Sequence, residues 1–222
     1  MKIKIQNFLK ENPHSFALLY FVVYVLWFFG LEFFAEPKYW LYSPFDDLIP
    51  FCEYFIVPYF LWFPYFLGAL GYFLFKDKNL FIRLCLVMFG GMTVSLIIYT
   101  FFPNAIDLRA EILRDNIFCK FAGLLRTVDT PTNVCPSIHC SSTLAVHWAV
   151  WKYKNFKFPK LTKFISLILA VLICLSTVFL KQHSVIDVFY GLLLTVVLII
   201  LLNIYERNER FMPQFIRGYL KS

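Results

Sequence analysis

The chain has 222 residues, of which 60% are apolar, 21% aromatic and only 16% charged. Soluble domains carry roughly 45–50% apolar and about 25% charged residues, so a water-soluble globule of this length could not bury so much apolar surface. The composition argues against a disordered chain, a disulfide-rich mini-domain and a soluble nucleic-acid binder. The net charge of +7 indicates no nucleic-acid partner by itself. We expect a polytopic membrane protein.

Five apolar runs are long enough to cross a bilayer, which takes about 17 to 25 residues of helix. They cover residues 16–34, 54–75, 80–102, 164–180 and 185–205. A sixth run over 139–153 is shorter and carries three hydroxyl residues and two histidines, so hydropathy alone leaves it undecided. Continuous runs predict helices, because strands of a membrane barrel alternate apolar and polar residues.

The distribution of Lys and Arg favours the sixth span. With six spans and a cytoplasmic N-terminus, one side of the membrane holds 15 of the 21 basic residues and four acids, a net charge of +11. The other side has a net charge of −4, as the positive-inside rule expects. Five spans would place the lysines of residues 152–163 outside. We predict an all-α bundle of six transmembrane helices in one membrane domain over 1–222, with both termini cytoplasmic.

The segments outside the spans are short. The first run is too long for a cleavable signal peptide, and the charged tail 206–222 is expected to be an interfacial helix or a frayed end. Residues 35–53 are rich in aromatic residues and are expected at the headgroup level. Residues 103–138 hold most of the polar chemistry, with a short helix predicted from Asp115, as its cap, to about Thr127.

The six cysteines show no metal-ligand spacing. Cys85 and Cys174 lie inside predicted spans and are interpreted as packing residues. Cys119 and Cys135 share the second outer segment, and the spacing leaves open whether they pair or stay free.

His183 and Asp187 stand four residues apart at the start of the last span. On a helix they share one face, and a carboxylate beside an imidazole fixes its tautomer and raises its basicity. The other ring nitrogen is then free to act as a nucleophile or a base. The alternatives are a histidine and an acid that only pack helices, and a metal pair. Further ligands for a metal are missing from the sequence, so no metal is predicted.

The string Pro136-Ser137-Ile138-His139 precedes the fourth span. A Pro followed by Ser can start a helix, whose free N–H groups bind anions. The Ser137 hydroxyl can add a donor, and His139 can protonate a leaving oxygen. The alternative is a helix cap beside an interfacial histidine.

Together the two strings resemble the type-2 phosphatidic acid phosphatase superfamily over about residues 80–205, taken here as the catalytic core. The motif P-S-x-H and the motif S-R-x5-H-x3-D match at Pro136, Ser137 and His139 and at Ser176, His183 and Asp187. The basic motif that ends in Arg-Pro corresponds to Arg109-Ala110. The stretch STVFLKQHSVIDV is closer to the branch that includes inositol phosphorylceramide synthase-like proteins.

The chain departs from the family pattern at three positions. Phe102 stands where the family has Lys, Ala110 where it has Pro, and Thr177 where it has Arg. Since a transferred phosphoryl group needs positive charge around its oxygens, Lys181 is expected to substitute for the missing cations. Candidate helpers are Arg114, Lys120, Arg126 and Thr177, and the alternative for the three cations is ordinary interfacial charge.

The resemblance implies a phosphohistidine mechanism. His183 attacks phosphorus, Asp187 orients its ring, and His139 protonates the leaving oxygen and then activates water. The phosphoryl oxygens are held by Arg109, Ser137, Ser176 and Lys181, with no metal and no cofactor. His183→Ala is expected to abolish turnover and Asp187→Asn to cripple it.

The function implied is a lipid phosphate phosphatase that hydrolyses a lipid phosphomonoester or diphosphate. Its partners are the lipid phosphate and the bilayer, with no nucleic acid. We expect an integral membrane protein, of a bacterial inner membrane, with the site on the outer face. The alternatives are a phosphotransferase like the sphingolipid synthases, a weakened pseudoenzyme, and a transporter or scaffold, whose polar residues would instead spread along the midplane.

Overall fold

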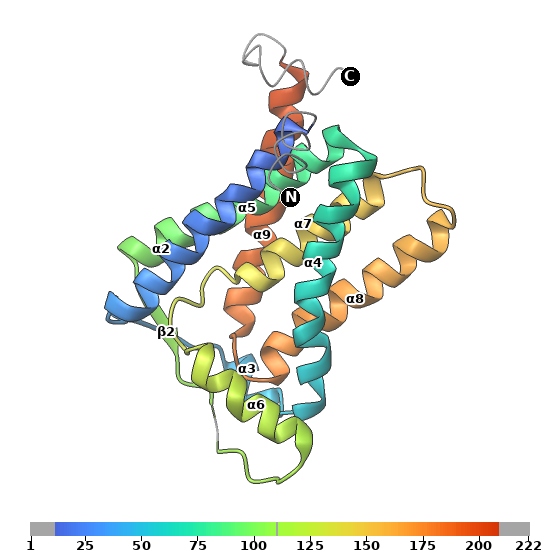
Figure 1. Cartoon of the computed structure of the whole chain (residues 1–222). Coiled ribbons are helices and arrows are strands. Elements are labelled where there is room, and N and C mark those ends of the chain that lie inside the picture. Colours follow the sequence, from blue (N-terminus) through green and yellow to red (C-terminus); the bar gives the residue numbers. More distant parts are fainter. Residues whose placement is uncertain (1–11, 110, 209–222) are drawn as a thin grey trace, which may run out of the picture.

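The computed structural model describes residues 12–109 and 111–208. Its helical elements are η1 (Pro13–Leu19), α2 (Tyr20–Phe34), α3 (Pro44–Leu48), η2 (Glu53–Phe55), α4 (Ile56–Lys76), α5 (Lys78–Phe101), α6 (Ile117–Val128), α7 (Ile138–Lys152), α8 (Pro159–Phe179) and α9 (Val185–Arg207). The strands are β1 (Tyr39–Leu41) and β2 (Asn104–Ile106). Most of the described residues are helical, which confirms the predicted all-α class (Figure 1).

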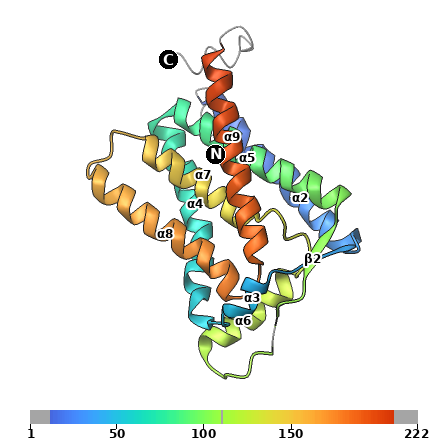
Figure 2. The ribbon, with the colours of Figure 1, turned by 180° about the vertical axis from the view of Figure 1, so that it is seen from behind.

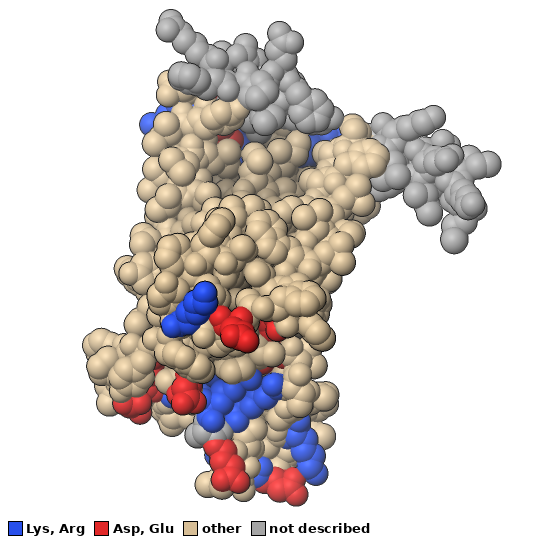
Figure 3. Space-filling model, turned by 90° about the vertical axis from the view of Figure 1, so that its left-hand side faces the viewer, with Lys and Arg blue, Asp and Glu red and all other residues tan. Residues whose placement is uncertain are grey.

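Five of the six predicted spans form helices long and apolar enough to cross a membrane, over 13–34, 53–76, 78–101, 159–179 and 185–207. Large apolar side chains are exposed along them, such as Leu26, Phe164 and Ile200, and a soluble protein would bury these side chains. Figure 3 shows that charged side chains on one face gather toward the end that carries α6, whereas the middle of the bundle is apolar. The chain is therefore an integral membrane protein.

The sixth predicted span forms α7, the central helix of the bundle. With 15 residues it is about 22 Å long, shorter than a hydrocarbon core of about 30 Å. It packs against α5, α8 and α9, and its small residues Ala145 and Ala149 are fully buried. Figures 1 and 2 show α7 leading the chain back toward the end where α9 finishes. The number of membrane crossings and the side of the termini stay predictions, and most of the tail 206–222 lies outside the described residues.

The helix predicted in the second outer segment is present as α6, but its predicted cap was wrong. Asn116, and not Asp115, is the N-cap, because the Asn116 side-chain oxygen accepts a hydrogen bond from the backbone N–H of Cys119 at 2.9 Å. Asp115 instead forms an exposed ion pair with Lys120 at 3.2 Å. All six cysteines, Cys119 and Cys135 included, are free thiols in the structure.

A two-stranded parallel sheet joins the two outer segments, which the sequence did not predict. Trp40 of β1 pairs with Ala105 of β2, so the segment after α2 runs beside the segment after α5. β2 is fully buried, and Pro103 directly before it ends the helix hydrogen bonding of α5. Strands of three residues carry too little periodicity to be read from sequence. The sheet fixes Asn104 at the edge of the candidate site.

Candidate active site

The two predicted histidines lie together at the end of the bundle covered by α3, α6 and β2 (Figures 1 and 2). His139 is in the first turn of α7, and His183 is in the turn between α8 and α9. Their ring centroids are 5.7 Å apart, and both rings line one cavity of about 40 Å³. One water needs about 10–15 Å³ of such space, so the cavity has room for a small polar group.

His183 and Asp187 form the predicted pair. His183 Nδ1 lies 3.3 Å from Asp187 Oδ2, which also accepts the backbone N–H of Ser184 at 2.8 Å. Burial by itself lowers the pKa of the His183 imidazole, but the hydrogen bond and the charge of Asp187 outweigh burial and raise it. The neutral ring therefore directs Nδ1–H at the carboxylate and leaves Nε2 as the free nitrogen.

The turn that carries His183 is shaped by the end of α8. The backbone N–H groups of Gln182 and His183 both donate to the carbonyl of Thr177, at 2.9 and 3.1 Å. Lys181 adopts a left-handed conformation with φ of 58°, which closes the turn. Ser184 then caps α9, with its hydroxyl oxygen accepting the N–H of Ile186 at 3.2 Å.

His139 is fixed by aromatic packing. Its ring lies 4.3 Å from the ring of Trp62 and 4.8 Å from that of Tyr59, centroid to centroid. The Trp62 indole N–H donates to Ser142 Oγ at 2.8 Å, and the Tyr59 hydroxyl donates to the carboxylate of Asp129. Both aromatic residues come from α4, so a helix before the motifs orients the second histidine.

The two motif loops contact one another directly. The backbone N–H of Ser137 donates to the carbonyl of Asp187 at 3.0 Å, and Ser137 Oγ caps α7 by accepting the N–H of Cys140 at 3.3 Å. A Cβ added at Gly191 would lie 2.5 Å from the Ser137 carbonyl oxygen, so only glycine allows this approach of α9 to the start of α7.

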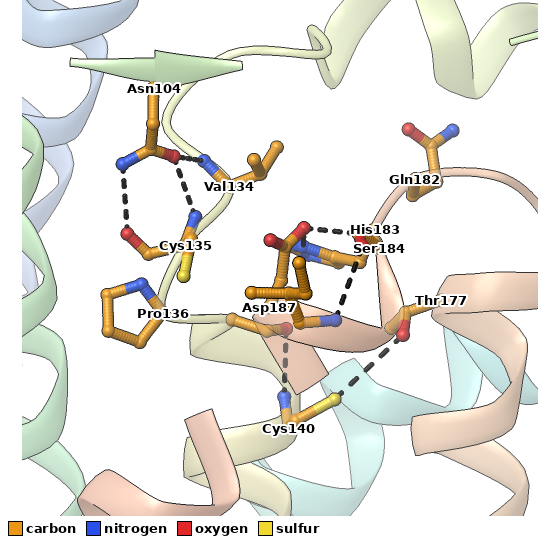
Figure 4. A network of polar contacts seen from close by, with 12 residues as sticks. Asn104, Val134, Cys135, Pro136, Cys140, Thr177, Gln182, His183, Ser184 and Asp187 are labelled. Atoms are coloured by element: carbon orange, nitrogen blue, oxygen red, sulfur yellow. Dashed lines mark hydrogen bonds and ion pairs between the residues drawn. The ribbon is translucent and has the colours of Figure 1, made fainter. Parts of the chain in front are cut away.

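Asn104 holds the loop before α7 in place (Figure 4). Its side-chain oxygen accepts the backbone N–H groups of Val134 at 3.0 Å and Cys135 at 2.8 Å, and its amide donates to the Cys135 carbonyl at 3.0 Å. The Tyr99 hydroxyl donates to the carbonyl of Pro136, which follows a cis peptide bond, at 2.6 Å. Burial, with the nearby charge of Asp187, raises the pKa of the Cys135 thiol to about 12, so the thiol stays neutral.

Arg109, on the second outer segment, contacts two residues that line the cavity. Its guanidinium donates to the side-chain oxygen of Gln182 and, at 2.6 Å, to the carbonyl of Asp129. Gln182 and Asp129 both line the cavity with the two histidines. The predicted phosphate-binding arginine therefore lies at the site, although the Pro expected after it is replaced by Ala110, which lies outside the described residues.

The other predicted cations have partners elsewhere. Lys181 Nζ donates to the carbonyl of Asp46 at 2.6 Å, and Arg114 pairs with Glu53 at 2.7 Å. Arg126 lies 5.2 Å over the ring of Phe51.

The two predicted hydroxyl residues at the end of α8 are fully buried. Ser176 Oγ donates to the carbonyl of Ile173 at 2.6 Å, and Thr177 Oγ1 donates to that of Cys174 at 2.8 Å. Each hydroxyl is thus engaged by its own helix. In this arrangement the structure gathers His139, His183, Asp187, Arg109 and Ser137 around one site, while Ser176, Thr177 and the remaining cations are engaged elsewhere.

Several residues at the site were missed from the sequence. They are Glu32, Asp46, Asn104, Asp129 and Gln182. Only Asp46 carries a local signal, since Ser43 and Asp46 have the spacing of a capping box, which predicts a helix start but not its contacts. The others are distant in sequence from the residues that they touch.

Comparison with known proteins identifies the family. No curated protein and no solved structure matches the chain. The family model of the PAP2 superfamily matches residues 86–211, more than half of the chain and nearly all of the predicted catalytic core. The match does not resolve a branch, so the inositol phosphorylceramide synthase-like branch stays a prediction. The chain belongs to the PAP2 superfamily, whose members are phosphatases or phosphotransferases.

Proposed function

We propose that the protein is a lipid phosphate phosphatase that hydrolyses a phosphomonoester or diphosphate of a lipid through a phosphohistidine. The observation that carries the proposal is the pairing of His183 with Asp187, at 3.3 Å, on the wall of a cavity that His139 also lines. A two-step transfer requires a nucleophile oriented by an acid and a second histidine that can donate and accept a proton.

In the first step, the lone pair of His183 Nε2 attacks phosphorus. The P–N bond forms as the bond from phosphorus to the lipid oxygen breaks, and His139 gives its proton to that oxygen. In the second step His139 takes a proton from water, the water oxygen attacks phosphorus, and the P–N bond breaks to release phosphate. Splitting one displacement into two lowers the barrier of each.

The charge that stabilises the phosphoryl oxygens is assigned to Arg109 and to the N-terminus of α7, where Ser137 adds a hydroxyl. This assignment is supported by the contacts of Arg109 with Gln182 and Asp129 beside the cavity. Lys181, bound to the carbonyl of Asp46, is assigned instead to the support of the His183 turn. Ser176 and Thr177 are assigned to the same turn through their backbone carbonyls. The Thr177 carbonyl accepts the N–H groups of Gln182 and His183, and the Ser176 carbonyl accepts that of Leu180.

The substrate is proposed to be amphiphilic and to enter from the outer leaflet. The charge distribution over the predicted spans favours an orientation with this end outside. Apolar helices that could accommodate acyl or prenyl chains continue from the site through the bundle. Phosphatidate, lysophosphatidate, phosphatidylglycerophosphate and undecaprenyl diphosphate fit this description. A bacterial inner membrane is the proposed location.

One observation favours a phosphotransferase as the second candidate. The Asp129 side chain lines the same cavity as the histidines, and a carboxylate beside a phosphate site can accept a hydrogen bond from an alcohol. An acceptor lipid bound in this way would take the phosphoryl group in place of water. Such an enzyme would release little phosphate and would need the second lipid.

The test measures phosphate release from a panel of lipid mono- and diphosphates by protein in nanodiscs, with EDTA and with or without diacylglycerol or ceramide. We expect EDTA-resistant release that His183→Gln abolishes and that Asp187→Asn lowers by about 10³- to 10⁴-fold, as loss of the correct tautomer does in serine proteases. His147→Gln, on α7 and hydrogen-bonded to Ser166 at 3.0 Å, is the matched control and should retain activity.

Near-normal phosphate release by His183→Gln would contradict the proposal. A new phospholipid that forms only with the acceptor, without free phosphate, would establish the phosphotransferase instead. In that case too, trapping of radiolabelled phosphate on His183 should be lost in His183→Gln.

A further inference from the structure

Asp46 is a buried acid that the mechanism does not use. It lies in α3, on the first outer segment, and the residue is only 2% exposed. Its Oδ2 accepts the Ser184 hydroxyl at 2.6 Å and the Ser43 N–H at 2.9 Å, and its Oδ1 accepts the N–H of Val185 at 2.9 Å. A buried carboxylate is costly unless it is fully hydrogen-bonded, and these three donors meet that requirement.

Two of these donors belong to the N-cap of α9, Ser184, and to its first residue, Val185. The carboxylate therefore lies at the N-terminus of a long helix, where free N–H groups and the helix dipole stabilise negative charge. The backbone carbonyl of Asp46 also accepts Lys181 Nζ, at 2.6 Å. Figure 2 shows α3 directly beside the start of α9. Asp46 therefore contacts the His183 turn at two places. Its backbone carbonyl binds Lys181, and its carboxylate binds Ser184 and Val185.

The contact continues to the proposed nucleophile through one residue. The Ser184 hydroxyl donates a hydrogen bond to Asp46, and the Ser184 backbone N–H donates to Asp187 Oδ2, the oxygen that faces His183 Nδ1. If Asp46 released Ser184, the donor that orients the Asp187 carboxylate would move, and the imidazole would lose its fixed partner. Ring orientation matters because a displacement of 1 Å can cost about 100-fold in rate.

We propose that Asp46 is a positioning residue, which holds Ser184 and the start of α9 so that Asp187 keeps His183 in its reactive orientation. The proposal rests on the proposed function of His183. It assigns a role in the site to α3, a segment that lies before the family match at 86–211.

The first experiment compares Asp46→Asn with Asp47→Asn in nanodiscs. Asp47 is the adjacent acid on α3, but it is exposed and bonded only locally, to the Tyr42 hydroxyl. We expect Asp46→Asn to lower kcat by about 100-fold while KM stays within about threefold, because the phosphate-binding groups are untouched. Asp47→Asn should match the parent chain. An unchanged kcat in Asp46→Asn, or a loss confined to KM, would overturn the proposal.

A double-mutant cycle tests the path through Ser184. Ser184→Ala removes the hydroxyl that Asp46 holds and should lower kcat in the same direction. If both residues act through one path, Asp46→Asn/Ser184→Ala should be no slower than the slower single variant. Losses that multiply would show independent effects and overturn the proposal. Ser184→Ala also keeps the test open should Asp46→Asn fail to fold.

A second readout does not depend on turnover. In protein labelled with ¹⁵N-histidine, the ¹⁵N chemical shifts of the His183 ring report its tautomer. The His183 signals are those that disappear in His183→Gln. We expect one tautomer, protonated at Nδ1, in the parent chain and in Asp47→Asn, and a mixture of tautomers in Asp46→Asn. An unchanged tautomer in Asp46→Asn would overturn the positioning role. Absence of phosphate release and transfer in the parent chain would instead refute the proposed function, so the two failures are distinguishable.

Discussion

The region before residue 86 and the family-matched region after it contribute to the site in different ways. The proposed reacting and phosphate-binding groups His139, His183, Asp187 and Arg109 all lie within 86–211. The earlier region supplies instead two acids, Glu32 and Asp46, that hold the loops carrying those groups. The family motifs thus contain the proposed reactive side chains, whereas the outer segment and α2 before them contact the loops that carry those side chains.

Glu32, at the end of α2, is the counterpart of Asp46 on the other loop. Its Oε1 accepts the Asn133 amide at 2.8 Å and the Thr132 hydroxyl at 3.2 Å, while its Oε2 accepts the Thr130 hydroxyl. Asn133 has φ of 54°, a left-handed conformation, three residues before Pro136. Glu32 therefore stabilises the turn from which the Pro136-Ser137 loop begins.

Among the contacts that hold the loops of the site, the largest effect is expected from breaking the one within the family-matched region. In Gly191→Ala, the new Cβ would meet backbone atoms of Ser137 at 2.5 to 3.3 Å, which cannot move without displacing α7 from α9. We expect kcat to fall by about 100-fold or more and the free energy of unfolding to fall by about 1–3 kcal/mol. Phosphate release in nanodiscs measures the change in kcat, and thermal unfolding in nanodiscs measures the change in stability.

Gly68→Ala is the matched control for this variant. Gly68 lies in α4 with nothing within 4 Å of its added Cβ, so alanine should leave activity unchanged and favour the helix by about 0.5–1 kcal/mol. Equal activity of Gly191→Ala and Gly68→Ala would show that the close approach of α9 to α7 is dispensable.

A smaller effect is expected from the earlier region, in Glu32→Gln. Glutamine keeps an acceptor for Asn133 but replaces charge-assisted hydrogen bonds by neutral ones, which are about half as strong. We expect kcat to fall by about 10-fold, with a Tm lower by a few degrees. Glu36→Gln, an exposed acid just after α2, should change neither. If Glu36→Gln lowered kcat and Tm as much as Glu32→Gln, the cause would be the loss of any negative charge near the end of α2 rather than of the contact with the loop.

The smallest effect is a shift in pH dependence, and it sharpens the comparison by separating charge from position. The pKa of His183 is raised above its ordinary value of 6.5, so the attacking lone pair becomes available only at higher pH. We expect the acid limb of kcat/KM to lie above pH 6.5, with activity lost as pH falls through it. Glu32→Gln should keep the same midpoint, because the pKa of His183 is raised chiefly by Asp187, whereas Asp187→Asn should lower it.

Folding stability follows the same ionisation in the opposite sense. The imidazolium–carboxylate pair stabilises the fold fully below pH 6.5, and this contribution is lost as pH rises through the raised pKa of His183.

The activity profile tests the direction of the pKa shift. A midpoint of the acid limb of kcat/KM below pH 6.5 would show that burial lowers the pKa of His183 more than Asp187 raises it, and would contradict the raised pKa.

The membrane helices and the reactive pair could be predicted from the sequence because both rest on local patterns. Long apolar runs specify helices whatever their neighbours, and the observed ends of α4 and α5 lie within two residues of the predicted ones. The spacing of four residues predicted that His183 and Asp187 meet, and they do, although the expected common helical face is wrong: His183 lies in the turn just before α9, which begins at Val185. The match to residues 86–211 then confirms the superfamily that the two histidine motifs indicate.

The contacts of the predicted cations could not be read from the sequence, because position in the sequence does not fix where a long side chain points. Lys181 lies two residues before His183, yet its left-handed backbone and the nearby carbonyl of Asp46 direct its ammonium to α3. Arg109, 74 residues before His183 in the printed sequence, reaches Gln182 beside it.

By itself, the sequence determined a membrane-embedded helical bundle and the groups available for phosphoryl transfer, because hydropathy and i,i+4 spacing act within one segment. Only the tertiary structure decided which groups meet. Three contacts join segments that are far apart in the chain: β1 pairs with β2, α9 approaches Ser137, and Asp46 accepts the hydroxyl of Ser184. Such contacts depend on how whole helices pack, and no local pattern encodes that packing.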